Sequence, residues 1–474
     1  MRGRMRAALL AVAAAAGSGG CALESAPQHD EVLKQALPAS TIVPSAWTGE
    51  ASDDPVANDW LTSLGDPQLE AILAEALANN PDLRVAAERV TVAWQSAVVV
   101  GSQLLPQVNG QVGGLSSHFE HESGYADTAT AFLAVGWELD VWGRLRAQRA
   151  AAEASAAATA LDYRRARQSL AATVAKAWYL AIETRQLLEL AEQSVQIYSE
   201  LLQLVTLRRT AGRDSDLDVF DTRAKMETAQ SEVHAAQAQF DESRRALETL
   251  LGRYPAAEIA VAADYRPLAA PPAAGLPAGL LLRRPDVAAA EQQVLAAFRL
   301  EESARLSLLP QVSLALLGGY LGTLLDAEDG HNPSVMVGSI GASIPIYEGG
   351  ALQAQVEIAT AQQAQAVASY GGIVLAAFRE VEDSLQNETL LASRLPLDES
   401  ALQDRTASVR VATQQYQAGR QDLLWVSNLQ TSQLEQEASL IKLRSLLRVN
   451  RVRLLLALGG DFDAAPAAAG SSGE

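Results

Sequence analysis

The sequence predicts a mainly α-helical chain that carries four membrane β-strands and is built as two tandem repeats. Three observations predict this fold class: short motifs recur at a fixed spacing, long windows lack both glycine and proline, and short segments alternate apolar with polar residues. The composition agrees, because 49% of the 474 residues are hydrophobic but only 5% are aromatic. Alanine-rich, aromatic-poor chains are typical of long, closely packed helices.

The charge balance and the rare residues exclude several function classes. The formal net charge is −19, and a polyanion is a poor partner for nucleic acid because phosphate contacts need clustered Lys and Arg. A single cysteine excludes an internal disulfide and a Cys-based zinc site. His118 and His121 lie close together, and we interpret them as part of a solvated loop rather than a metal site. We expect no catalytic residues and no cofactor.

Residues 1–20 have the composition of an export signal. Basic residues lie within the first six positions, an apolar run follows at 7–16, and small residues precede Cys21, the only cysteine. A lone cysteine directly after such a site resembles the bacterial lipobox, which implies acylation of Cys21, for example with palmitate, and sorting to the outer membrane. The alternative is an ordinary signal peptide with an incidental cysteine.

Two copies of one plan make up the mature chain. The motif Pro81-Asp82-Leu83 recurs in similar form 204 positions later, and so does the LPQV motif that begins at Leu105. Three glycines recur at an offset of 207, namely Gly143, Gly212 and Gly252 as Gly350, Gly419 and Gly459. Glycines and motifs that share nearly one offset indicate an internal repeat.

The predicted organisation has six segments. These are a signal peptide (1–20), a lipidated extended N-terminal segment (21–58), repeat 1 (59–252), a connector (253–279), repeat 2 (280–459) and a mobile C-terminal tail (460–474). The connector is recognised by its proline and alanine content.

Each repeat begins with a helix and continues into a pair of strands. The proline-free segments 82–104 and 286–308 directly follow a proline, which is favoured at the start of a helix. Strand pairs are predicted within 108–140 and 311–346, because apolar and polar residues alternate there with a period of two. An acidic loop joins the strands of each pair.

A long helical hairpin completes each repeat, at 144–251 and at 351–458. Residues 144–211 lack glycine and proline over 68 positions, enough for about 100 Å of helix. Three residues are expected to interrupt the long helix of repeat 2: Gly371, Gly372 and Pro396. Helices of this length must pack side by side as a coiled coil, with Gly212 and Gly419 at the turns.

Four strands cannot close a barrel by themselves. The smallest outer-membrane barrels have about eight strands, and open sheet edges are not tolerated in lipid. An outer-membrane location therefore requires oligomerisation, and three chains would contribute twelve strands. The long helices of three chains would then form a hollow cylinder beneath the barrel.

Several motifs carry a resemblance to a known family. In chain order they are the segments 59–67, 80–83, 137–144 (WELDVWGR), 280–287 (ending in RRPDV), 344–350 (IPIYEGG), 416–419 and 457–460. The chain resembles the TolC-like outer-membrane factors of the NodT lipoprotein type, which are the exit ducts of tripartite efflux systems.

This resemblance implies a homotrimer with a twelve-stranded barrel, a coiled-coil α-barrel and a mixed equatorial belt built from the termini and the connector. Such a duct conducts drugs or other small solutes passively and contributes to multidrug resistance. It opens when it docks to a periplasmic adaptor protein and an inner-membrane efflux pump of the RND type. The implied location is the lipid of the outer membrane, with a long periplasmic extension.

The resemblance also implies functions for the hairpin tips. Adaptor docking is expected at Arg208, Gly212, Leu217, Tyr416, Gly419 and Leu423. The gate candidates are Asp218, Asp221, Arg420, Trp425 and Asn428. Two of them depart from the family pattern, since Trp425 and Asn428 stand where members often have aspartate.

Three interpretations of the gate stay open. A ring of Trp425 side chains forms the constriction, or a shift of one residue in register brings Asp422 into it. Alternatively, Trp425 is a coiled-coil core residue and the aspartates form a solvated first helical turn favoured by the helix dipole. By family analogy, Arg420 is expected to link to Asp218 or Tyr416 in the closed state. The acidic balance predicts a lumen that favours cations.

Two other function classes compete with the duct. A pore-less periplasmic coiled-coil lipoprotein, structural or adaptor-like, explains Cys21 and the hairpins but not the strand pairs or the LPQV motifs. A hydrolase would need a convergent polar cluster in a compact pocket, and the sequence offers no such cluster. The sequence does not specify the exported solute or the cognate pump.

Overall fold

A computed structural model describes residues 23–49, 52, 54, 56, 62–119, 124–323 and 334–459. The predicted signal peptide, Cys21, the C-terminal tail and most of the two strand-joining loops lie outside the described residues. The chain divides into two compact units. The first holds the described residues of 1–41, 88–161 and 288–373, and the second holds those of 42–87, 162–287 and 374–474.

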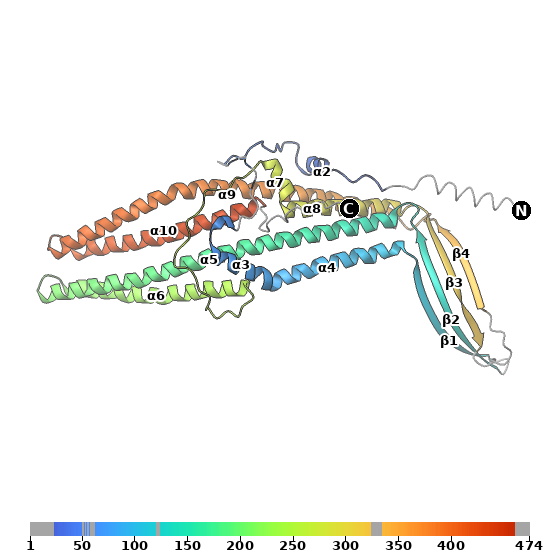
Figure 1. The fold of residues 1–474 in the computed structure, drawn as a ribbon, viewed down its shortest axis with the longest axis horizontal. Helices are drawn as coiled ribbons and strands as arrows, with labels where there is room; N and C mark the ends of the chain where they lie inside the picture. Colours follow the sequence, from blue (N-terminus) through green and yellow to red (C-terminus); the bar gives the residue numbers. More distant parts are fainter. Residues whose placement is uncertain are drawn as a thin grey trace, which may run out of the picture. The chain divides into compact units, whose positions relative to one another are not determined.

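The four strands form one antiparallel sheet in the order β1-β2-β3-β4, within the first unit (Figure 1). Strand β1 spans Gln107–Phe119, β2 Gly124–Leu139, β3 Gln311–Thr323 and β4 Ser334–Ser343. Strand β4 ends before the predicted limit at residue 346, since Pro345 has no N–H to donate to a neighbouring strand. His118, which was expected in a loop, lies in β1, whereas His121 lies outside the described residues.

The two faces of the sheet differ in polarity. One face carries apolar side chains that are exposed in the single chain, among them Val112, Leu133, Trp137, Leu316 and Ile340. The opposite face is mainly small or polar, with Gln107, Asn109, Gln111, Thr130, Ser313 and Ser339. One apolar and one polar face is the pattern of a barrel wall between lipid and water. Strands β1 and β4 are the two edges of this wall.

The helices of the two repeats correspond closely. Helix α4 spans Pro81–Gly101 and continues into the 3-10 turn η2 (Ser102–Leu104), and its counterpart α8 spans Pro285–Leu306. The hairpin of repeat 1 consists of α5 (Arg144–Thr210) and α6 (Asp216–Leu250), and that of repeat 2 consists of α9 (Ala351–Gln417) and α10 (Leu423–Ala457). Helices α5 and α9 each have 67 residues, and α6 and α10 each have 35.

Helix α9 runs through the three residues that were expected to interrupt it, so that prediction is wrong. Gly371 has a packing reason instead: a Cβ atom there would collide with the carbonyl oxygen of Ala36, at the end of α2 (His29–Ala36). Pro396 follows soon after Leu391, which is buried in a cluster with α10. This packing offsets the cost of an internal proline, which is about 3 kcal/mol.

Three shorter helices were not predicted. Helix α2 lies within the segment expected to be extended, and the N–H of Gln28 donates to Glu31 in its first turn (2.9 Å). Helices α3 (Pro67–Asn79) and α7 (Pro277–Arg283) occupy equivalent places before α4 and α8. Each begins with a proline, which is preorganised for the first helical position. Helix α7 starts inside the predicted connector, so the connector is shorter than expected.

The core of the second unit is centred on Trp178. This side chain is fully buried among residues of α3, α5, α6 and α10. Its indole N–H donates to the carboxylate of Asp66 (2.9 Å), which also accepts hydrogen bonds from the first N–H groups of α3. A single buried aspartate therefore joins the start of α3 to the middle of α5.

Two charged side chains hold the connector on the second unit. The carboxylate of Glu248 accepts hydrogen bonds from the N–H groups of residues 257–259, at 2.6–2.8 Å. Burial by itself would raise the pKa of Glu248, but these three donors lower it. Further along, Arg451 donates to the carbonyl oxygens of residues 269–270 and pairs with Glu388. The connector is thus anchored at both ends of its course.

Candidate functional site at the helical hairpin tips

Each hairpin turns through the same backbone motif. At the first tip Gly212 has a φ of +71°, and the N–H of Arg213 donates to the carbonyl oxygen of Arg208 (2.9 Å). At the second tip Gly419 has a φ of +72°, and the equivalent hydrogen bond measures 2.8 Å. This is the Schellman motif, in which a left-handed residue ends a helix. Both glycines lie at the turns, as the sequence predicted.

A capping residue starts the returning helix at each tip. Ser215 and Asp218 cap each other reciprocally, since the N–H of Ser215 donates to the Asp218 carboxylate (2.8 Å) and the N–H of Asp218 donates to the Ser215 hydroxyl (3.2 Å). At the second tip the N–H of Trp425 donates to Asp422 (3.0 Å). Asp422 is therefore engaged as a helix cap, and Asp218 and Trp425 occupy equivalent positions.

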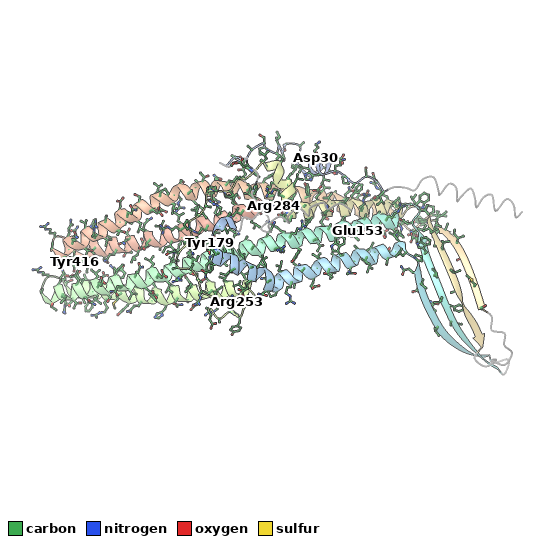
Figure 2. All side chains as sticks on the ribbon, viewed as in Figure 1. Asp30, Glu153, Tyr179, Arg253, Arg284 and Tyr416 are labelled. Carbon is green, nitrogen blue, oxygen red and sulfur yellow. The ribbon has the colours of Figure 1, made fainter. Side chains whose placement is uncertain are left out.

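A buried link joins the two tips within one chain. The Tyr416 hydroxyl, on α9, donates to the carboxylate of Asp214 in the first tip. The Arg208 guanidinium pairs with the same carboxylate (3.0 Å), donates to the carbonyl oxygen of Tyr416 (2.8 Å) and lies 4.2 Å from the centre of its ring. Tyr416, labelled in Figure 2 near the end of the hairpins, is buried, with an exposed fraction of 1%. Three side chains from two repeats thus form one closed network.

The network has a well-defined protonation state. Burial raises the pKa of the Tyr416 hydroxyl, and its hydrogen bond to Asp214 raises it further, so this hydroxyl stays protonated at neutral pH. The hydrogen bond to Asp214 raises the pKa of the Arg208 guanidinium as well. At neutral pH, therefore, both the Tyr416 hydroxyl and the Arg208 guanidinium carry the protons that they donate to Asp214.

The link from Arg420 to Asp218 or Tyr416 that was expected for the closed state is not formed within the single chain. Asp218 is held by Ser215, and the Tyr416 hydroxyl is held by Asp214. Arg420 lies beyond the tip glycine and is exposed, whereas Arg208 lies one turn before its own tip on the side that faces α9. In the sequence, Arg208 and Asp214 lie on either side of Gly212, and these two opposite charges were the only sequence signal of the network.

Apolar residues divide between the inside and the outside of the tips. Leu423, expected to dock a partner, is 5% exposed and packs in a core with Tyr416 and Val426, so it is not a surface residue. Five large apolar side chains remain exposed at the tips: Leu207, Leu217, Phe220, Leu424 and Trp425. The tips therefore present an apolar surface around their polar turns.

The other gate candidates lie on the outer turns of the returning helices. Trp425 is 54% exposed, so the interpretation that places it in the core of this chain's coiled coil is wrong. Asp221 pairs with Lys225 (3.0 Å), whose ammonium also donates to Ser427 on α10 (2.6 Å). Asn428 is exposed. Hence Asp221 contributes to a second, more exposed bridge between the repeats.

The comparisons with known proteins agree with this geometry. Residues 72–253 and 276–460 match the family described as outer membrane efflux protein. The chain belongs to this family. It is 29% identical to the pyoverdine export outer membrane protein OpmQ of Pseudomonas aeruginosa over 443 residues, which cover 90% of this chain and 93% of OpmQ. It is 30% identical to the toluene efflux pump outer membrane protein TtgF of Pseudomonas putida over 414 residues, which cover 85% and 86% of the two chains.

A solved structure confirms the fold. The outer membrane protein VceC of Vibrio cholerae superposes with a TM-score of 0.78 at 25% identity, covering 86% of this chain and all of VceC. The predicted fold class, the family and the role in outer-membrane efflux are therefore confirmed.

Two further properties concern only the described residues. No helix among them is both long and apolar enough to span a membrane. Within the same residues, no group of three or more His, Cys, Asp or Glu side chains is arranged to hold a metal ion.

Proposed function

We propose that three copies of the chain form a duct through the outer membrane that conducts small solutes passively. The observation that carries this proposal is the sheet, which has one apolar face, one polar face and two edge strands in a single chain. Unpaired backbone groups are not tolerated in lipid, so β1 and β4 must both be covered. A closed ring of three copies pairs every edge and makes a barrel of twelve strands.

The proposed partners are a periplasmic adaptor protein and an inner-membrane pump of the RND type. Relatives named as efflux pump outer membrane proteins support the assignment to a multicomponent system. The exposed apolar side chains at the two tips support docking there, with Leu217 and Leu424 at equivalent positions. Adaptor contact at the tips would bury this apolar surface, which is otherwise open to water.

The closed state of the duct is held, in this proposal, by the network of Arg208, Asp214 and Tyr416. The network links the hairpins of the two repeats, so the hairpins cannot separate while it is intact. The side chains of Asp218, Asp221, Trp425 and Asn428 follow the tips and are the proposed constriction. Arg420 is exposed and available to a neighbouring copy.

Acylation of Cys21 is proposed to anchor the chain in the outer membrane. The side chain of Leu23 lies against Gly143, which directly precedes α5; a Cβ atom on Gly143 would be 3.5 Å from Leu23. Cys21 is only two positions before Leu23 in the sequence, so an acyl group on Cys21 would be tethered to the membrane-proximal end of the helices.

Conductance of the purified assembly tests the proposal. The chain, extracted in detergent from native membranes, should migrate as a heat-modifiable trimer and open discrete single channels in planar bilayers. In a salt gradient the reversal potential should indicate a preference for cations, because the chain carries a net charge of −19. A monomer without channel activity would instead identify a pore-less coiled-coil lipoprotein.

A further inference from the structure

The first unit contains a cleft of about 450 Å³ that the hairpin tips do not involve. Side chains of four segments line it, from α4 with η2, α5, α8 and α9. Its polar groups are four glutamines and one serine: Gln103, Gln148, Ser155, Gln293 and Gln362. The remaining lining is aliphatic, and no lining side chain is charged. An uncharged cleft is unexpected in a chain with a net charge of −19.

The helices present these residues in regular stripes. On α5 the cleft is lined by residues 148, 151, 152 and 155, and on α8 by residues 293, 296, 297 and 300. Both sets follow the spacing i, i+3, i+4, i+7, which places side chains on one face of a helix. Alanine at the two middle positions of each stripe leaves the space, while Gln148 and Ser155 at the ends of the α5 stripe and Gln293 at the start of the α8 stripe supply polar groups. Leu300 ends the α8 stripe with an apolar side chain. The cleft is thus built by the helix faces and not by an irregular loop.

The cleft lies on the face of the helices that is turned away from the N-terminal segment. That segment contacts α8 through His29 and Glu291 (2.9 Å) and contacts α9 at Gly371. Gln293 is two residues from Glu291, which is about 200° around the helix. Gln362 is nine residues from Gly371, which is about 180° away. In the duct proposed above, where the acylated N-terminal segment lies on the outside, the opposite helix faces with the cleft would line the lumen.

The polar groups of the cleft are free to bind a solute. Among the described residues, none of the four glutamine side chains has a hydrogen-bond partner. Each amide offers both donors and an acceptor. On α5, the charged neighbours Arg149 and Glu153 pair with each other (2.8 Å) and do not line the cleft. An ion would therefore find no counter-charge here, whereas a neutral molecule would find amides and aliphatic surface.

We propose that this cleft is a binding site for small, neutral, amphiphilic solutes on the inner wall of the duct. The proposal rests on the function proposed above and adds the class of solute. The volume of the cleft lies in the range of about 300–1,000 Å³ that is usual for sites of drug-sized ligands. Its mixture of aliphatic surface with a few polar groups is also typical of such sites. The negative charge of the lumen wall acts on ions, whereas the cleft would retain neutral solutes.

Equilibrium dialysis of the detergent-solubilised, full-length trimer with radiolabelled chloramphenicol tests the site. This probe is neutral and combines an aromatic ring with amide and hydroxyl groups. Wild type should bind it saturably, and Gln148→Leu and Gln362→Leu should each weaken binding about fivefold, the cost of a lost hydrogen bond. The cation ethidium should not compete.

Matched controls come from the chain itself. Gln355 is the counterpart of Gln148 in repeat 2, and Gln353 precedes Gln362 by nine residues, which is about 180° around α9. Both control residues are exposed and neither lines the cleft. Gln355→Leu and Gln353→Leu should bind the probe as wild type does. No saturable binding to wild type, equal losses in the controls, or full competition by ethidium would each overturn the proposal.

Single-channel recordings of the same preparations separate this proposal from the one on which it rests. Wild type and all four variants should conduct. A trimer that conducts but does not bind chloramphenicol refutes the cleft alone. A preparation that binds the probe without forming channels refutes the duct and with it the placement of the cleft in a lumen.

Discussion

The two hairpin tips share one backbone and differ in the side chains that it presents. Ser215 and Asp422 are equivalent at an offset of 207, and each caps a helix. Directly after these caps the repeats diverge, with Asp218 opposite Trp425 and Asp221 opposite Asn428. The backbone turn requires only the glycine and the N-cap residue, so the positions after the cap can carry different side chains without altering the turn. The first tip is acidic, and the second is neutral and aromatic.

The link between the tips uses this difference. Asp214 and Arg208 belong to the first tip, and Tyr416 belongs to the second. Each repeat thus supplies a group that the other lacks. A duplicated chain can therefore hold its two hairpins together by an unequal contact, although both turns have the same geometry.

The largest effect is expected in a cross-linking test of adaptor docking, because the test yields either an adduct or none. The equivalent substitutions Ala211→Cys and Ala418→Cys should both give an adduct with the adaptor when cells are treated with a bismaleimide. Ala235→Cys, exposed in the middle of α6, is the matched control and should give none. An adduct from one tip only would show that the repeats are not equivalent in docking, and no adduct from either would refute docking at the tips.

Asp214→Asn should open the resting channel. The substitution keeps the shape of the side chain but removes the charge that binds Arg208 and Tyr416, which costs about 2 kcal/mol of closed-state stability. The open fraction should therefore rise at least about tenfold in planar-bilayer recordings. Asp216→Asn, at a carboxylate that is 63% exposed, should leave the recordings unchanged. Equal behaviour of the two variants would contradict a role of the network in closure.

Comparison of Trp425→Ala with Asp218→Ala sharpens the assignment of the constriction. Asp218→Ala removes a capping box and should lower the free energy of unfolding by about 1 kcal/mol. Trp425→Ala removes an exposed side chain and should change the free energy of unfolding little. If the aromatic ring forms the constriction, Trp425→Ala should raise the single-channel conductance and Asp218→Ala should not. The reverse result would assign the constriction to the carboxylates.

The smallest effect is expected from pH, because it lies outside the physiological range. The pKa of Tyr416 is raised above its ordinary value of 10.0, so the folded state keeps this hydroxyl protonated to a higher pH than an unfolded chain does. Its contribution to closure should be complete below pH 10.0 and be lost as pH rises towards the raised value. Conductance of wild type should increase in that alkaline window, while Tyr416→Phe should show no such step. A step that persists in Tyr416→Phe would assign it to another group.

Most of the fold was predictable from the sequence because the signals are local. The glycines at 143, 212 and 252 and their counterparts at an offset of 207 revealed the duplication, and the period-two segments revealed the strands. The short helices α3 and α7 were missed, although both begin with a proline. The candidate site was predicted only in part: the tips were located, but Arg420 was chosen where Arg208 forms the link.

By itself, the sequence determined the repeat, the lengths of the helices, the alternation of the strands and the position of each turn, since all of these depend on residues close together in the chain. Only the tertiary structure decided that α9 passes through Gly371, that Asp214 meets Tyr416, and that glutamines of several helices line one cleft. The partners of the Asp214 bond are separated by 202 positions. Contacts over such separations depend on how whole helices pack, and no short pattern encodes that packing.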